Sequence, residues 1–245
     1  MKATPIPCLT PELHSRNHTP QDRLPSGTSA FSFSELLVVV AMLGLLLVSA
    51  LAQPKSRATQ TSCVNNLRQV GQAIQMFADE HSDYLPPGGS SGLWIGQSGV
   101  YRSTGTNDLC YHLAIYMGEL PPSPGASGEV KAFACPARER ELKPDGSASQ
   151  VVFALNSGFP DLTFQPFGYP SPGGFPQMPS HRLAEIQAQK PLSQVWSMID
   201  ADQWGYPTLA WSAGLPRKSV HGQIRNALYF DGHVAPRTVG ASGTH

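Results

Sequence analysis

The most apolar stretch of the sequence runs from Phe31 to Ala52 and reads FSFSELLVVVAMLGLLLVSALA. As a helix this stretch is about 33 Å long, which is enough to cross the hydrocarbon core of a bilayer. Its only charged side chain is Glu35. A carboxylate inside a membrane costs several kcal/mol unless it is paired or lies near the interface. The stretch therefore predicts a transmembrane helix, residues 31–53, in which Glu35 needs a specific partner.

A second helical pattern, residues 54–82, follows the transmembrane stretch. Its apolar side chains recur at spacings of three and four residues and polar residues fill the other face, as in an amphipathic helix that packs on a core. The apolar stripe consists of Val64, Leu67, Val70, Ile74, Phe77 and Ala78. Pro86-Pro87-Gly88-Gly89 ends the pattern. The remaining residues, 83–245, are enough for one globular head domain.

Short runs of β-branched and aromatic residues predict strands in this head. They are Val151 to Leu155, Gln194 to Ile199, and Asn226 to Phe230. Asp231-Gly232, followed by His233 to Pro236, predicts a hairpin with a two-residue turn in which glycine supplies a positive φ. A short helix is expected at Asn107 to Met117. The expected fold class is α+β, with a long N-terminal helix, a small antiparallel sheet and long loops rich in glycine and proline.

The charge balance and the motifs exclude several functions. Basic and acidic residues number 17 each, so the chain has no basic field for a phosphate backbone, and nucleic acid is not an expected partner. The sequence has no nucleophile elbow, no phosphate-binding loop with lysine and no His-Glu-x-x-His motif. We therefore expect a protein that is not an enzyme and that needs no cofactor.

The cysteines are Cys8, Cys63, Cys110 and Cys135, and their spacing fits neither a zinc site nor a c-type haem. Two interpretations remain open. Cys110 and Cys135 form a disulfide if the head lies outside the cytoplasm, or the cysteines are buried free thiols, which is the commoner state.

The sequence AFSFSELLVVVAMLGLLL, from Ala30 onward, resembles the processing and methylation site of type IV prepilins. The resemblance implies that a prepilin peptidase cuts between Ala30 and Phe31, that residues 1–30 are a cytoplasmic leader, and that the new amine of Phe31 is methylated. It also implies that Glu35 neutralises the terminal ammonium of a neighbouring subunit, which offsets the burial of both charges. Two positions depart from the family preference, since Ala30 replaces glycine and Ser34 replaces an aliphatic residue.

The sequence is also similar to a pseudopilin-like group that has a C-terminal His-x9-Asp-Gly motif. The matching residues are Cys63, Asn66, Leu67, Phe133-Ala134-Cys135-Pro136, His221, Asp231 and Gly232. The resemblance implies a pilin-like fold, a single pass through the inner membrane, and a head in the periplasm or in an extracellular fibre. The expected function is that of a structural subunit of a type II secretion pseudopilus or a type IV pilus-like fibre. Its expected partners are prepilin peptidase, other pilin-like subunits that contact its N-terminal helix, and an inner-membrane assembly platform.

Four polar residues of the head are candidates for chemistry. Asp200 and Asp202 lie at alternate positions, and Asp231 would approach them if their strands pair, so the three are weak candidates for calcium. Solvated turn aspartates are the alternative. His221 and Asp231 suggest a catalytic pair, but if only Arg225 to Phe230 are extended, at about 3.3 Å per residue, the ends of that run lie roughly 20 Å apart. Structural roles are therefore favoured for both.

A secretory signal peptide is the competing interpretation of the N-terminus. Leu36 to Val48 has the length of its apolar core, and Ala50-Leu51-Ala52 before Gln53 matches its cleavage site. The chain would then be a secreted or membrane-tethered binding module, for instance for polysaccharide. The aromatic residues of its loops would form either a recognition patch or anchors to the core. They are Phe159, Phe164, Phe167, Tyr169 and Phe175.

Overall fold

The computed structural model describes residues 32–52, 54–120, 123–140, 150–158, 160–170, 176–207 and 210–239. The chain divides into two compact units, residues 1–49 and residues 50–245. Helix α1 (Phe33–Ala52) is the element that the structure describes in the first unit, and its last three residues belong to the second unit. The expected leader, with Ala30, and the first expected mature residue, Phe31, lie outside the described residues.

Helix α1 begins with a capping arrangement. The backbone N–H of Ser32 donates to Oε2 of Glu35 at 3.0 Å. A glutamate at the third helical position that binds the backbone of the N-cap residue is half of a capping box. Within the described residues, no helix is both long enough and apolar enough to span a membrane.

The second unit contains the expected antiparallel sheet, which confirms the α+β class. Its five strands follow the order β1-β4-β5-β6-β7, and every neighbouring pair is antiparallel. They are β1 (Gly96–Gln97), β4 (Phe153–Leu155), β5 (Trp196–Asp200), β6 (Ile224–Tyr229) and β7 (Val234–Thr238). All three predicted strands are present. A separate ribbon of β2 (Val100–Arg102) and β3 (Ser127–Glu129) has no counterpart in the prediction.

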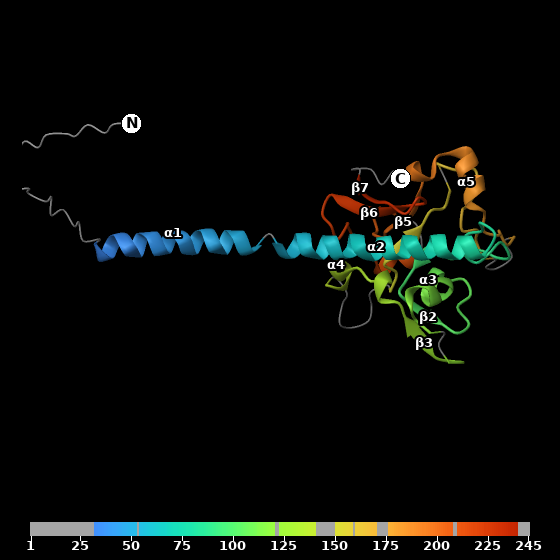
Figure 1. Cartoon of the computed structure of the whole chain (residues 1–245), viewed down its shortest axis with the longest axis horizontal. Coiled ribbons are helices and arrows are strands. Elements are labelled where there is room, and N and C mark those ends of the chain that lie inside the picture. Colours follow the sequence, from blue (N-terminus) through green and yellow to red (C-terminus); the bar gives the residue numbers. More distant parts are fainter. Residues whose placement is uncertain are drawn as a thin grey trace, which may run out of the picture. The chain divides into compact units, whose positions relative to one another are not determined.

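Helix α2 (Pro54–Glu80) lies between two layers of the second unit. It contacts β6 and β7 on one side and the short helices α3, η1, η2 and α4 on the other (Figure 1). These helices are α3 (Leu109–Leu113), η1 (Ala114–Met117), η2 (Lys131–Phe133) and α4 (Pro136–Glu139). The predicted helix at Asn107 to Met117 is therefore confirmed as α3 followed by η1. Because α2 has contacts on two sides, we expect more than one face of the helix to be buried.

The predicted stripe of α2 is buried, with one exception. Leu67, Val70, Ile74, Phe77 and Ala78 are at most 4% exposed. Val64 is only partly buried, whereas its neighbour Cys63 is fully buried. The difference arises because α2 is covered on two sides, so that the buried face extends beyond a single stripe.

The sheet has two covered faces. Phe153, Leu155, Met198 and Leu228 belong to the same core as the apolar face of α2. Side chains of alternate strand positions join a second, smaller core, because successive side chains of a strand point to opposite faces. This second core consists of Ala154, Trp196, Ile199, Ala201, Leu215 and Ala227, and Trp211 of η4 (Ala210–Gly214) packs against it.

The predicted hairpin at the end of the chain is confirmed, but its turn is one residue longer. Tyr229 donates its N–H to the carbonyl of His233, and Gly232 donates to the carbonyl of Tyr229, both at 2.9 Å. Phe230, Asp231 and Gly232 therefore form a three-residue loop in which Gly232 has a φ of 86°. That loop ends in the left-handed residue of a bulge, the position that favours glycine.

Helix α5 (Leu183–Gln189) and η3 (Leu192–Gln194) precede β5. Ala184 N–H donates to Oδ2 of Asp83 at 2.8 Å, which fastens the first turn of α5 to the segment that follows α2. Helix α5 was not predicted from the sequence; it has seven residues, of which only Leu183 and Ile186 are buried, so it carries no extended apolar stripe.

Candidate functional site

The candidate site lies where a disulfide and a hydrogen bond join α2 to the segment before α4. Cys63 of α2 forms a disulfide with Cys135, with their Cα atoms 5.0 Å apart. One turn further along, Nδ2 of Asn66 donates to the carbonyl of Ala134 at 2.7 Å. Residues three apart on a helix share a face, so the two side chains act on the same partner. The Cys-x-x-Asn and Ala-Cys elements of the sequence thus form one attachment point, above the fully buried Leu67.

Of the two open interpretations, the disulfide between Cys110 and Cys135 is wrong. Cys110 is a buried free thiol on α3, and Cys135 pairs with Cys63 instead. Burial, with a smaller contribution from the nearby Asp108, raises the pKa of the Cys110 thiol to about 12. The interpretation as buried free thiols is therefore correct for Cys110 and wrong for the other two cysteines of the head.

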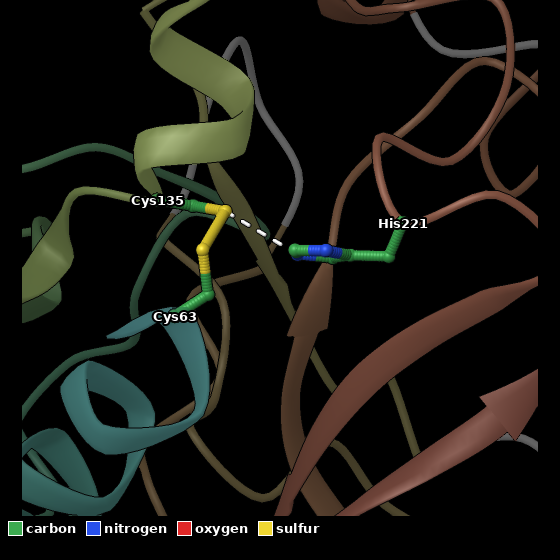
Figure 2. Close-up of side chains that lie close together, drawn as sticks. All are labelled: Cys63, Cys135 and His221. Carbon is green, nitrogen blue, oxygen red and sulfur yellow. Dashed lines mark hydrogen bonds between the residues drawn. A yellow bond between two sulfur atoms is a disulfide. The ribbon is translucent and has the colours of Figure 1, made fainter. Parts of the chain in front are cut away.

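His221 approaches the disulfide from the loop that precedes β6 (Figure 2). Its Nε2 lies 3.4 Å from Sγ of Cys135. A disulfide sulfur carries no proton, so the ring nitrogen must be the donor in this contact. The same Nε2 lies 3.6 Å from Oδ2 of Asp200, and both side chains are no more than 5% exposed. The imidazole is therefore enclosed between a sulfur and a carboxyl group.

Burial favours the neutral forms of both His221 and Asp200. It lowers the pKa of His221 and raises the pKa of Asp200 to about 7. Hydrogen bonding from Asn226 opposes the second shift, and the Asn226 backbone N–H donates to Oδ2 of Asp200 at 2.7 Å. Among the described residues, Oδ1 of Asp200 and Nδ2 of Asn226 are buried and make no hydrogen bond of ordinary geometry.

The structure does not bring the three calcium candidates together. Both oxygens of Asp202 accept hydrogen bonds from Arg225, at 2.6 and 2.7 Å, in a buried ion pair. Asp231 lies in the β6–β7 turn, where its Oδ1 is 2.5 Å from Nδ1 of His233. In the part of the chain that the structure describes, the only three histidine, cysteine or acidic residues grouped closely enough to share an ion are Cys63, Cys135 and His221.

The two ends of the His-x9-Asp-Gly motif have separate surroundings. His221 faces the disulfide and Asp200, whereas Asp231 and Gly232 form the turn that packs on α2. A side-chain carbon added to Gly71 of α2 would lie 3.4 Å from Cα of Gly232, so helix and turn are in close contact. Nearby, Nε2 of Gln75 donates to the carbonyl of Phe230 at 2.6 Å.

The aromatic loop residues that the structure describes are anchors. Phe167 is buried, and Phe164 stacks on His181 with ring centroids 3.9 Å apart. Tyr169 is half-buried and meets Trp94 edge to face. Phe159 and Phe175 lie outside the described residues. The three described members therefore fit the anchoring interpretation.

Glu35 is the described residue of the processing motif, and it is exposed apart from its bond to Ser32. No family model matches this sequence, and no match is found among curated proteins or among solved structures. Any functional assignment must therefore come from the motifs and the contacts described above.

Proposed function

We propose that this chain is a pilin-like structural subunit, a pseudopilin that is anchored in the inner membrane by its N-terminal helix and assembled through that helix into a type II secretion pseudopilus or a type IV pilus-like fibre. The observation that supports this most directly is Glu35, a carboxylate at the start of a helix whose apolar side chains are exposed on every face. The head would lie in the periplasm or on the fibre surface.

The exposed apolar surface of α1 requires a cover. Leu36 to Val40, together with Met42 and Leu43, are between 47% and 63% exposed. Successive residues of a helix are about 100° apart, so this stretch presents apolar side chains in every direction. A helix that is apolar all round is stable when it is surrounded by lipid or by other helices. A pilin stem is surrounded by lipid while the subunit is in the membrane and by other helices once the subunit is in the fibre.

Glu35 has capacity for both a local and an intermolecular partner. Its Oε2 accepts the Ser32 N–H, and a carboxylate has two oxygens that accept several hydrogen bonds. Cleavage between Ala30 and Phe31 would leave Ser32 in the mature chain, so the cap would survive processing. Oε1 would remain for the terminal ammonium of a neighbouring subunit. Pairing of the two charges would reduce the cost of burying them inside a fibre.

The position of the mature N-terminus tests the proposal. The full chain is produced in a bacterial host together with a prepilin peptidase, purified from membranes, and analysed by N-terminal sequencing and mass spectrometry. We expect N-methylated Phe31. Mature protein that begins at Gln53 would refute the proposal and would support a signal peptide.

A pair of variants shows whether the motif directs the cleavage. Ala30→Gly restores the residue that prepilin peptidases prefer, so the cleaved fraction should rise. Ser29→Gly places the same residue one position earlier and should leave the fraction unchanged. Equal cleavage of both variants would argue against the assigned bond.

Loss of the carboxylate tests assembly. Glu35→Ala should leave insertion into the membrane intact and lower the amount of the subunit in sheared fibres. Asp79→Ala removes an exposed carboxylate from α2 and serves as the matched control. Normal incorporation of Glu35→Ala would contradict the pairing of Glu35 with a neighbour.

A binding module remains the second candidate, and one observation favours it. A cavity of about 260 Å³ beside α2 is lined by aromatic and histidine side chains. These include Phe77, His81, Tyr101, Tyr111, His112 and Tyr116. Aromatic faces of this kind suit the apolar faces of sugar rings. Glycan-array binding by protein that starts at Gln53, abolished by Tyr111→Ala, is the result expected of this alternative.

A further inference from the structure

Three potential metal ligands converge in the core of the second unit from segments that are far apart in sequence. Cys63 lies on α2, Cys135 directly before α4, and His221 in the loop before β6 (Figure 2). Their Sγ and Nε2 atoms all lie within 4.8 Å of one another. Two thiolates and an imidazole form a ligand set typical of zinc.

Two of the distances at His221 Nε2 are close to the edges of a zinc tetrahedron, whereas the two sulfurs are bonded to each other and must separate to about 3.8 Å to bind an ion. With zinc bonds of about 2.3 Å to sulfur and about 2.05 Å to nitrogen or oxygen, a tetrahedron has edges of about 3.6 Å between sulfur and nitrogen and about 3.3 Å between nitrogen and oxygen. The observed Nε2 to Cys135 Sγ distance is 3.4 Å, and the Nε2 to Asp200 Oδ2 distance is 3.6 Å. Both are within about 0.3 Å of the ideal edges.

Asp200 is the candidate for the fourth position of the tetrahedron. Asp200 faces the same nitrogen, and its second oxygen, Oδ1, is buried with no hydrogen bond of ordinary geometry among the described residues. Asp200 lies outside the group formed by the two sulfurs and the nitrogen, so its carboxylate must move toward them to complete the shell. A divalent cation also balances the charges of the two thiolates, which lowers the cost of burying them.

We propose that, when Cys63 and Cys135 are reduced, their thiolates and Nε2 of His221 bind one Zn²⁺ ion, with Asp200 as the fourth ligand. A phosphine first reduces the disulfide: phosphorus supplies two electrons and becomes the phosphine oxide, and water supplies the oxygen and the two protons, which gives two thiols. Zinc then displaces both thiol protons and bonds to both sulfurs. The oxidised chain keeps its sulfurs in the disulfide and does not bind the ion. This site does not depend on assembly into a fibre.

Cobalt provides a direct optical probe of the site. The full chain is held in a mild detergent, reduced with a phosphine, and titrated with Co²⁺ alone under anaerobic conditions. We expect one equivalent to bind, with a thiolate-to-cobalt charge-transfer band and the intense visible bands of tetrahedral cobalt. Added Zn²⁺ should remove these bands. The oxidised chain, measured in parallel, should show none of them. A reduced chain that is folded by circular dichroism and binds no Co²⁺ would overturn the proposal.

His221→Gln is the decisive variant, because it retains both cysteines and therefore the disulfide. Its zinc affinity should fall by more than about 100-fold, the upper end of the loss seen when an outer partner of a metal ligand is removed. Cys110→Ser is the matched control for a buried thiol outside the group and should bind zinc like the unaltered chain. Unchanged affinity in His221→Gln, or lost affinity in Cys110→Ser, would overturn the assignment of the ligands.

Asp200→Asn tests the fourth ligand separately. It should weaken zinc binding and shift the visible bands of the cobalt form. Identical bands and identical affinity would show that Asp200 is not a ligand and would overturn that part of the proposal.

Discussion

Replacing Cys63 by serine removes the covalent link between α2 and the segment before α4. The disulfide closes a loop with a sequence separation of 72 residues. The chain-entropy relation for a loop of this length gives a stabilisation of about 4 kcal/mol at 25 °C. We expect Cys63→Ser to lower the free energy of unfolding of the head by about that amount.

Urea denaturation of the full chain in a mild detergent, followed by tryptophan fluorescence, measures this loss. All four tryptophans belong to the head, so their emission reports its unfolding. They are Trp94, Trp196, Trp204 and Trp211. With a urea dependence of about 2 kcal/mol per molar, the midpoint should fall by about 2 M.

Three comparisons separate the cross-link from simple loss of a buried sulfur. Cys135→Ser should be destabilised as much as Cys63→Ser, and the double variant should be little worse than either, because all three lack the same bond. Cys110→Ser, which alters a buried thiol outside the bond, should lose far less. If Cys63→Ser and Cys110→Ser unfold at the same urea concentration, the reasoning is refuted.

Three further changes follow from the structure. Asp202→Ala leaves Arg225 buried without its carboxylate, so the head should lose about 3–5 kcal/mol in the same urea assay, and a loss below about 1 kcal/mol would show that the charge is solvated. Gly232→Ala should cost about 1–2 kcal/mol through its positive φ alone, because no atom lies within 4 Å of the added carbon; an unchanged midpoint would mean that the turn relaxes. Cys110, with a pKa raised to about 12 by burial, should resist iodoacetamide at pH 8 in the folded chain and react once urea unfolds it, since only about one thiol in 10,000 is ionised at that pH. Rapid alkylation of the folded chain would show that Cys110 is accessible.

Local patterns were sufficient for the elements that have strong periodicity. The apolar spacing of α2 reports its buried face, and runs of β-branched or aromatic residues mark the segments that contain β4, β5 and β6, so these elements were predicted. Strand β1 (Gly-Gln) and strand β3 (Ser-Gly-Glu) contain no β-branched or aromatic residue that would predict a strand, and β2 has only three residues. Their pairing depends on which segments meet in the folded chain.

The attachment site illustrates a different limit. Sequence pointed to Cys63, Asn66 and His221 as motif residues, but it did not show that they meet Cys135 at one place. A disulfide between Cys110 and Cys135 was one of two open interpretations, whereas the fold places Cys135 against Cys63 of α2. Asp200 was considered for calcium because of Asp202, two residues away. Its structural neighbours are instead His221 and Asn226, which adjacency in sequence cannot indicate.

The early position of Cys63 in α2 has a mechanical consequence. A pull on the N-terminal end of α2 reaches Cys63 before it reaches the apolar contacts from Leu67 onward. The disulfide transmits this tension to Cys135. In the oxidised chain a covalent bond therefore bears the force that would otherwise separate the helix from the sheet. In a fibre under tension, α2 of the oxidised head would separate from the sheet only after the disulfide breaks. In a reduced head, α2 would separate from Leu67 onward at a much lower force.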